Sequence, residues 1–177
     1  LPNVVVMAPS DEEELAKMIM TASKYSDGPI FCRYPRGEGE GVDITDIVQD
    51  VKIGKGRIIR RGKDLAILAL GTRVGPALKV ADHLLQDNLK ITVADARFAK
   101  PIDTELLEKL WNEQQKLIII QERSAGGFSS HCLHFLSTND FLNKHDKEIK
   151  CLTMPVNFQD HAPQKEQLAR AGLDTDG

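Results

Sequence analysis

From Leu65 onward, short apolar runs alternate with longer amphipathic segments, and this alternation constrains the fold more than any other feature of the sequence. Such spacing is typical of parallel strands joined by right-handed helical crossovers. We predict strands at 65–70, 90–95, 117–121 and 149–154, with helices near 75–87, 103–113 and 128–138 between them. The sequence therefore predicts an α/β domain built on a mostly parallel sheet.

The helical segments carry apolar residues at the spacing that places them on one face of a helix. Asp103 stands at the N-cap position of the second helix, directly after Pro101 and Ile102. The predicted buried stripes are Ala77, Leu78, Ala81, Leu84 and Leu85 in the first helix, and Leu106, Leu107, Leu110 and Trp111 in the second.

The first 36 residues predict one separate β-α-β unit. The run from Asn3 to Ala8 is apolar and β-branched, and Ile30 to Tyr34 forms a second strand. Ser10 and Glu13 have the spacing of a capping box at the start of the helix between them. The predicted inward stripe of this helix is Leu15, Met18, Ile19 and Ala22. A unit of this size cannot bury a sufficient core alone.

A glycine-rich, acidic segment separates this unit from the rest of the chain. We predict a linker over 37–52, which divides the chain into 1–36 and a domain over 53–177. After the linker, segments 56–60 and 65–70 flank the polar sequence 61–64 and predict a hairpin. This hairpin would give the otherwise parallel sheet one antiparallel edge strand.

The composition excludes several classes of function. The net charge of -3 gives no general attraction to nucleic acid or to an anionic membrane, so any anion site must be local. No apolar run approaches the length of about 20 residues that spans a bilayer. Without a signal-peptide pattern, the expected location is the cytoplasm of a bacterium, or the plastid stroma in a plant. Three widely spaced cysteines predict buried thiols rather than disulfides or a zinc ribbon: Cys32, Cys132 and Cys151.

The strongest candidate site is the segment from Arg33 to Gly37, where the second predicted strand ends. Ligands of open α/β sheets bind at the carboxyl ends of strands. A guanidinium there can hold a phosphate through two hydrogen bonds, and Gly37 lets the backbone approach closely. A surface arginine in an ordinary ion pair is the alternative.

Other motifs favour structural interpretations. The glycines at 37, 39 and 41 precede no helix and alternate with glutamates, unlike a dinucleotide fingerprint, and Gly54-Lys55-Gly56 lacks the rest of a P-loop. His131-Cys132-x-His134 lacks the geometry of a metal site. Glu122 is either a general acid or base, or a structural carboxylate that caps a helix or forms an interface contact. The basic residues of the hairpin predict a solvated face: Lys52, Lys55, Arg57, Arg60, Arg61 and Lys63.

A set of longer motifs adds a family resemblance. These are Leu1-Pro-Asn-Val-Val-Val-Met-Ala-Pro-Ser-Asp-Glu12, Asp27-Gly-Pro29, Arg33-Tyr-Pro-Arg-Gly37, Ile53-Gly-Lys-Gly56 and Asp95-Ala-Arg-Phe-Ala-Lys-Pro-Ile-Asp103. With them, essentially the whole chain resembles the 1-deoxy-D-xylulose-5-phosphate synthases. Further matches are Leu70-Gly-Thr72, Gln121-Glu122, Ala125-Gly-Gly127 and Gly172-Leu-Asp174.

The resemblance implies a layout and an activity. Residues 1–36 would end the pyrimidine-binding domain, and 53–177 would form a transketolase-like C-terminal domain. The implied enzyme is a homodimer that condenses pyruvate with D-glyceraldehyde 3-phosphate, releasing CO₂ and forming 1-deoxy-D-xylulose 5-phosphate, a precursor of isoprenoids, thiamine and pyridoxal. Its thiamine diphosphate and Mg²⁺ would be bound by regions outside this chain, so no catalytic, cofactor or metal residue is assigned here.

One site residue is implied by the resemblance: Arg36, which would bind the phosphate of glyceraldehyde 3-phosphate. The chain alone is expected to be inactive. Three alternatives remain open at this stage: the β subunit of a 2-oxo acid dehydrogenase, a transketolase, and a non-catalytic dimerisation or regulatory module.

Overall fold

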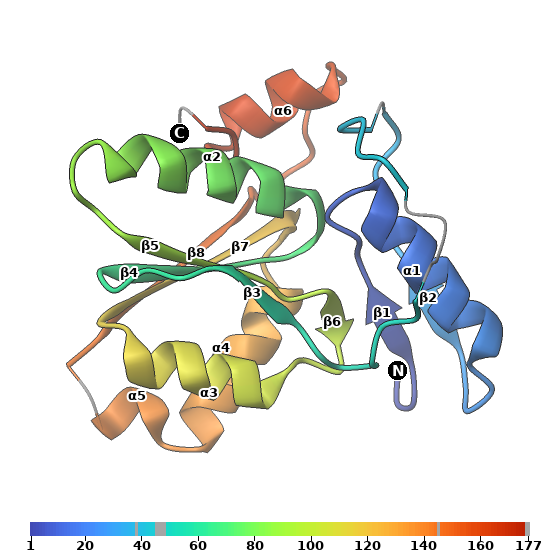
Figure 1. Cartoon of the computed structure of the whole chain (residues 1–177), viewed down its shortest axis with the longest axis horizontal. Helices are drawn as coiled ribbons and strands as arrows, with labels where there is room; N and C mark the ends of the chain where they lie inside the picture. The colour runs from blue at the N-terminus through green and yellow to red at the C-terminus, as the bar shows by residue number, and fades with distance from the viewer. Residues whose placement is uncertain (38, 45–48, 145, 176–177) are drawn as a thin grey trace.

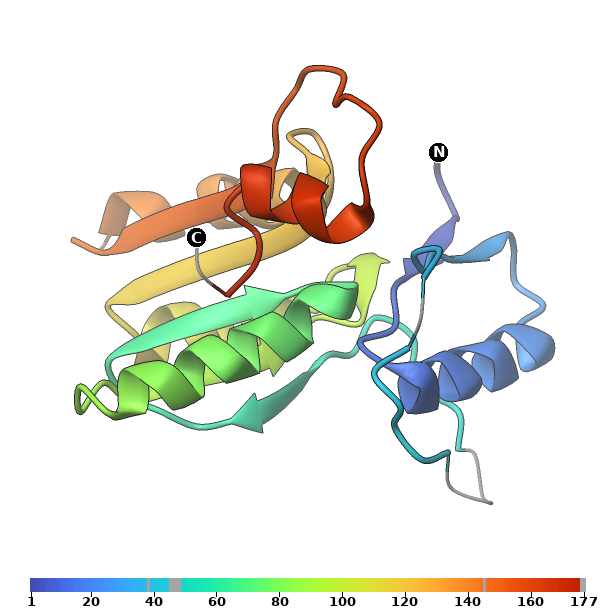
Figure 2. The same ribbon diagram turned by 90° about the horizontal axis from the view of Figure 1, so that it is seen from above.

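The computed structural model describes residues 1–37, 39–44, 49–144 and 146–175. Within them, the strands form one sheet of three strands and one of five. The small sheet and its helix stand beside the large sheet, at the carboxyl ends of its parallel strands, and are not stacked on its faces (Figures 1 and 2). We call residues 1–37 the N-terminal unit. Glu38 and residues 45–48 of the predicted linker lie outside the described residues.

The large sheet has the strand order β3-β5-β4-β7-β8. Its strands are β3 (Arg57–Arg60), β4 (Leu65–Ala69), β5 (Ile91–Asp95), β7 (Lys116–Ser124) and β8 (Glu148–Met154). The last four run parallel, whereas β3 is antiparallel to its neighbour. This confirms the predicted α/β class with a mostly parallel sheet and one antiparallel edge strand.

Helices cover both faces of this sheet (Figure 1). One face carries α2 (Val74–Leu85), which follows the short 3₁₀ helix η1 (Gly71–Arg73), and α6 (Gln164–Arg170). The other face carries α3 (Thr104–Glu113), α4 (Phe128–Thr138) and α5 (Phe141–Lys144). The predicted N-cap is confirmed, since the Asp103 side chain accepts a hydrogen bond from the backbone N–H of Leu106.

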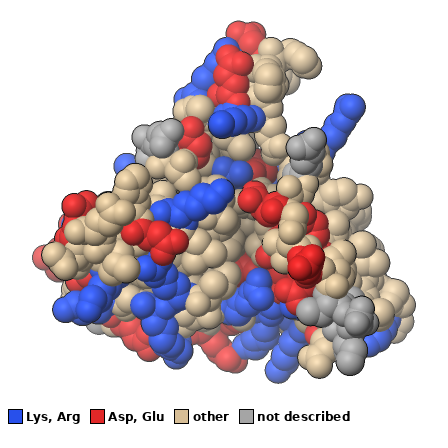
Figure 3. Space-filling view, turned by 45° about the horizontal axis from the view of Figure 1, so that its top comes forward, with Lys and Arg blue, Asp and Glu red and all other residues tan. Residues whose placement is uncertain are grey.

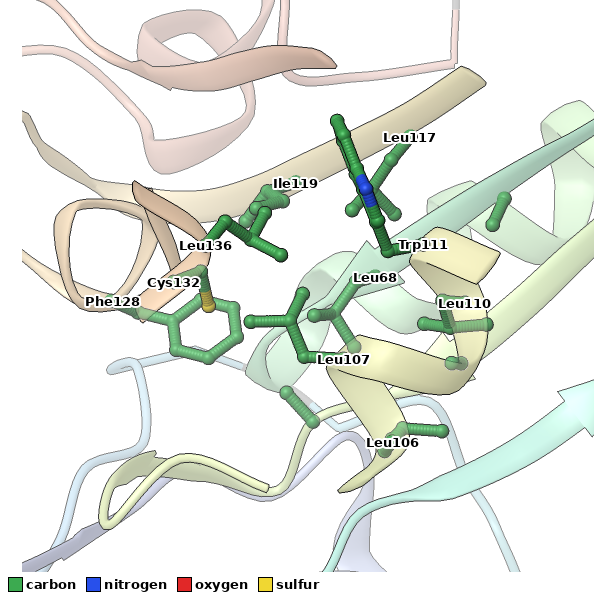
Figure 4. Close-up of a cluster of buried hydrophobic side chains, with 13 residues drawn as sticks. Leu68, Leu106, Leu107, Leu110, Trp111, Leu117, Ile119, Phe128, Cys132 and Leu136 are labelled. Carbon is green, nitrogen blue, oxygen red and sulfur yellow. The ribbon is translucent and has the colours of Figure 1, made fainter. Parts of the chain in front are cut away.

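Two apolar cores lie between the helices and the sheet. The stripe predicted for α3 is buried as expected, and Trp111 and Leu107 are 1% exposed. These side chains pack against Leu68, Ile119 and Leu136 (Figure 4). The stripe of α2 is buried at Ala77 and Ala81 on the opposite face, but Leu85 at its end is 44% exposed, contrary to the prediction.

The predicted hairpin is wrong. β3 does not pair with β4, which follows it in the chain, but pairs antiparallel with β5. The physical reason is that β4 is central in the sheet: its two edges are already bonded to the parallel strands β5 and β7. The connecting turn crosses the start of β5, where the backbone N–H groups of Lys63 and Asp64 both donate to the carbonyl of Lys90.

The N-terminal unit contains β1 (Val5–Met7), α1 (Glu12–Lys24) and β2 (Ile30–Cys32). β1 pairs parallel with β2 and antiparallel with β6 (Phe98–Lys100), a strand supplied by the segment after β5. Phe98 and Val51 also pack into the core of this unit, beside Val5, Met7 and Met18. Later parts of the chain thus complete the fold of the first residues.

The start of α1 and its buried face differ from the prediction. Asp11, not Ser10, is the N-cap: its side chain accepts from the backbone N–H of Glu14, and the Ser10 hydroxyl donates to it. Ile19 is 56% exposed, so its predicted burial is wrong. The buried face instead consists of Glu14, Met18 and Thr21, because the helix turns this side toward Val51, at the end of the predicted linker, and Arg97, which follows β5.

No helix in the described part of the chain is long and apolar enough to span a membrane. The three cysteines are free thiols; Cys132 is buried as predicted, whereas Cys32 and Cys151 are only partly buried. Burial raises the pKa of Cys132 to about 12 and also raises the pKa values of Cys32 and Cys151, which makes all three poor nucleophiles.

Candidate functional site

The segment predicted as the main site follows the carboxyl end of β2 and lines a cleft of about 410 Å³. The other walls are the start of α1 and the 3₁₀ helix η1. The lining residues are Pro9, Ser10, Asp11, Glu12, Leu15, Tyr34, Pro35, Arg36, Gly37, Gly39, Glu40 and Thr72. We call this the Arg36 cleft. Its volume lies within the range of small-molecule sites.

Arg36 is an exposed side chain of this cleft. Within the described residues, no acceptor is bonded to its guanidinium. The alternative prediction, a surface arginine in an ordinary ion pair, requires an acidic partner, and none of the described residues supplies one.

Acidic side chains restrict what the Arg36 cleft can bind. Asp11 is occupied as the N-cap of α1, and a Glu12 carboxylate oxygen accepts a hydrogen bond of 2.8 Å from the backbone N–H of Gly41. This hydrogen bond lowers the pKa of Glu12, which keeps the carboxylate charged. With Glu40 also on the wall, the cleft favours a ligand that places one anionic group at Arg36 and presents hydroxyl groups elsewhere.

Glu122 joins the N-terminal unit to the large sheet. Its carboxylate is 4% exposed, lies 2.9 Å from an Arg33 guanidinium nitrogen and 2.8 Å from one of Arg73, and accepts from the hydroxyl of Thr72. Of the two predicted roles, the geometry supports the interface partner, since both carboxylate oxygens are already occupied. Arg33 immediately precedes the Tyr34–Arg36 segment, so this contact positions the wall of the Arg36 cleft.

A second ionic cluster across the same interface was not predicted from the sequence. Glu14 in α1 is fully buried and accepts two hydrogen bonds from Arg97, of 2.7 and 2.9 Å. Arg57 in β3 lies 3.1 Å from Glu14 and 3.3 Å from Asp95. Burial raises the pKa of Asp95 to about 6. The signal for Glu14 was its position, one helical turn before Met18 on the buried face.

The structure also settles the roles of several basic residues. Arg57 does not belong to a solvated face, because it pairs with Glu14 and Asp95. Lys55, from the incomplete P-loop motif, lies 2.7 Å from Glu105, at the start of α3. Arg60 pairs with Asp82. These positions of the predicted basic face are thus partners of specific acidic residues.

The glycine-rich and histidine motifs, which were interpreted as structural, form no ligand-binding arrangement within the described residues. The glycines at 37, 39 and 41 precede no helix in the described residues. His131 and His134 are both exposed on α4. In the described part of the chain, no group of three His, Cys, Asp or Glu side chains is arranged to hold a metal ion.

Comparison with known proteins identifies the large sheet and its helices. Residues 54–177 match the family model of the transketolase C-terminal domain. The structure is also similar to that of a split gene transketolase described as an inactive beta4 tetramer, with a TM-score of 0.82 and 25% sequence identity. That match covers 99% of this chain and 55% of the other, so the chain spans about half the length of its structural relative. The chain belongs to the transketolase C-terminal domain family.

Proposed function

We propose that the chain is part of a 1-deoxy-D-xylulose-5-phosphate synthase. Such an enzyme condenses pyruvate with D-glyceraldehyde 3-phosphate and forms 1-deoxy-D-xylulose 5-phosphate and CO₂. The observation that carries the proposal is the position of the Arg36 guanidinium. It has no partner in the described residues, and it lines the Arg36 cleft together with its neighbours in the Arg33-Tyr-Pro-Arg-Gly37 motif. Membership of the transketolase C-terminal domain family supports the cofactor class.

The role proposed for Arg36 is to bind the phosphate of the aldehyde substrate. A guanidinium donates two parallel hydrogen bonds to phosphate oxygens, and both groups are charged. The Arg33–Glu122 contact and Pro35 restrict the segment that carries Arg36, so little conformational freedom is lost on binding. The carboxylates of Asp11, Glu12 and Glu40 would then face the neutral part of the substrate.

The cofactor in this proposal is bound outside the chain. Thiamine diphosphate supplies the nucleophilic carbon and the electron sink of such condensations, with a Mg²⁺ ion on its diphosphate. The described residues contain no set of side chains for that ion. The proposal therefore assigns to this chain the orientation of the aldehyde substrate, and no step at the cofactor.

The test uses the complete enzyme that contains this chain, with pyruvate, glyceraldehyde 3-phosphate, thiamine diphosphate and Mg²⁺. We expect Arg36→Gln to raise the KM for glyceraldehyde 3-phosphate about ten-fold or more, because one charged hydrogen-bonding group is lost. The KM for pyruvate should change by less than about two-fold. A matched control is Arg170→Gln, an exposed arginine on α6 that pairs with Glu166.

Equal changes in both KM values, or no change in either, would contradict the role of Arg36. A complete enzyme that transfers a two-carbon unit between sugar phosphates, without consuming pyruvate, would instead show a transketolase. This is the second candidate, and it is favoured by the similarity to a split gene transketolase. Acetyl transfer to lipoamide would show the β subunit of a 2-oxo acid dehydrogenase. The chain assayed alone should form no product.

Self-association is also part of the proposal. We propose that the complete enzyme is a homodimer, and the beta4 tetramer of the structural relative supports self-association in this family. Sedimentation equilibrium of the complete enzyme would measure this directly, and a monomer at micromolar concentration would contradict it.

A further inference from the structure

A second cleft, of about 350 Å³, lies at the seam between the N-terminal unit and the large sheet. Its walls come from β1, from the ends of β4, β6 and β7, and from the start of α4. We call it the Arg123 cleft. It shares no lining residue with the Arg36 cleft: it is lined by Val6, Ala8, Arg33, Leu70, Ala99, Lys100, Gln121–Phe128 and His131.

The strand order places this cleft where α/β sheets bind ligands. From β4 the chain passes to β5 on one side, and then returns past β4 to β7 on the other side. The carboxyl ends of β4 and β7 therefore mark the point at which the order reverses, and ligands of open α/β sheets bind in the crevice there. Leu70 directly follows β4, and Gln121 to Ser124 end β7; both line the cleft.

The charge of the cleft is locally positive, although the chain as a whole is negative. Arg33, Lys100 and Arg123 contribute three cationic side chains, and Glu122 contributes the single carboxylate of the lining. That carboxylate is nearly buried and also pairs with Arg73, which is not part of the lining. Arg123 is exposed and has no bonded acceptor within the described residues. Over the face in Figure 3, by contrast, acidic and basic side chains alternate.

The loop at the base of the cleft is held in place by a buried amide. The Gln121 side chain is 1% exposed and donates to the carbonyls of Arg123 and Ser124, at 3.2 and 3.1 Å. Its oxygen accepts from the backbone N–H of Ser129, at 2.9 Å. This shapes the turn through Gly126 and Gly127 before α4. The positive end of the α4 dipole adds to the attraction that the arginine and lysine side chains exert on an anion.

We propose that the Arg123 cleft binds a small phosphate monoester. Three cations around one ordered loop match a group with two negative charges, and the volume matches a small metabolite rather than a macromolecule. Arg73, which lies outside the lining, balances the charge of the single carboxylate, so the side chains of the cleft leave it positive. The site is separate from the proposed substrate site at Arg36.

The experiment titrates the ¹⁵N-labelled chain with glycerol 3-phosphate and follows its backbone amide signals. We expect saturable shifts at Ser124, Gly126 and Gly127. Arg123→Gln should weaken the affinity about ten-fold or more, because a charged hydrogen-bonding partner is lost. Lys100→Gln should weaken it in the same direction. Arg170→Gln, on α6 and outside the lining of both clefts, is the matched control and should leave this affinity unchanged.

Parallel titrations with inorganic phosphate and with sodium chloride distinguish the source of binding. Saturation by glycerol 3-phosphate or by inorganic phosphate supports the proposal. The compound that binds with the higher affinity shows which form of phosphate the cleft prefers. The same shifts with chloride at equal ionic strength would mean an adventitious ion only and would overturn it. The proposal would also be overturned if the shifts did not saturate at millimolar ligand, or if Arg123→Gln left the affinity unchanged. The Trp111 fluorescence of each variant confirms that it is folded. A loss caused by Arg36→Gln alone would assign the binding to the Arg36 cleft.

Discussion

Removing the Glu14 carboxylate should destabilise the contact between the N-terminal unit and the large sheet more than any neighbouring change. Glu14 is fully buried in α1 and contacts Arg97 and Arg57, at 2.7 and 3.1 Å for the shortest pairs. Glu14→Ala removes the carboxylate partner of Arg97 and leaves Arg57 with Asp95 as its remaining carboxylate in the cluster. Breaking a buried ion pair from one side costs about 3–5 kcal/mol. This is a large part of the about 5–15 kcal/mol that stabilises a typical domain.

Urea denaturation measures this loss with two probes. With an m value of about 2 kcal/mol/M, a loss of about 4 kcal/mol moves the midpoint down by about 2 M. The chain has one tryptophan, Trp111, and it lies in the core beneath the large sheet. Its fluorescence therefore reports that core, whereas circular dichroism also reports α1. We expect the circular dichroism midpoint of Glu14→Ala to fall further than the fluorescence midpoint.

Glu13→Ala is the matched control. Glu13 is adjacent in α1, and among the described residues its ion-pair partner is Lys17, at 3.0 Å, with 29% of the Glu13 side chain exposed. A helical surface pair contributes less than about 0.5 kcal/mol. Equal midpoints for Glu14→Ala and the unmodified chain, or an equal loss for both variants, would refute the argument that the buried cluster holds the two parts together.

Three further predictions concern the pH dependence, the core and a helix cap. Burial raises the pKa of Asp95 from 3.8 to about 6, so its contribution to stability is fully present below about pH 3.8 and is lost as the pH rises through about 6. The free energy of unfolding, compared with that of Asp95→Asn, should therefore fall over this range. A difference between the two proteins that stays constant with pH would contradict the raised pKa. Leu107→Ala should lower the free energy of unfolding in urea by about 2–5 kcal/mol, whereas Leu85→Ala, at an exposed position, should lower it by less than about 1 kcal/mol. Similar losses for the two variants would contradict the burial of Leu107. Asp103→Ala should cost about 1–2 kcal/mol by thermal unfolding, because Asp103 caps α3 and also accepts from the backbone N–H of Gly56; an unchanged melting temperature would refute this role.

The regular parts of the fold were predicted well, because those parts depend on local periodicity. The stripe from Leu106 to Trp111 and the Asp103 cap were both confirmed. The errors arose where a local signal was outweighed by distant partners. The sequence of a strand, a polar turn and a second strand favours a hairpin, but the edges of β4 were taken by β5 and β7.

The candidate site shows the same division. The motif around Arg36 was visible as an arginine and a proline after a strand, and the structure places it on a cleft. Glu122 was one of several isolated carboxylates in the sequence, and only the fold brings Arg33 and Arg73 to it. No spacing relates these residues, since they come from three distant segments.

Residue type and short-range periodicity were enough to predict the α/β class and the succession of β4, α2, β5, α3, β7, α4 and β8 along the chain, and to indicate the segment around Arg36 as a candidate site. Both signals act within one or two turns of chain, so they can be recognised without knowing what packs against each segment. The pairing of β3 with β5, the completion of the small sheet by β6, and the burial of Glu14 and Glu122 between the two parts emerged only in three dimensions. Those outcomes depend on which edges and charges remain unsatisfied once the distant segments have packed, and the free energy of each contact depends on its burial.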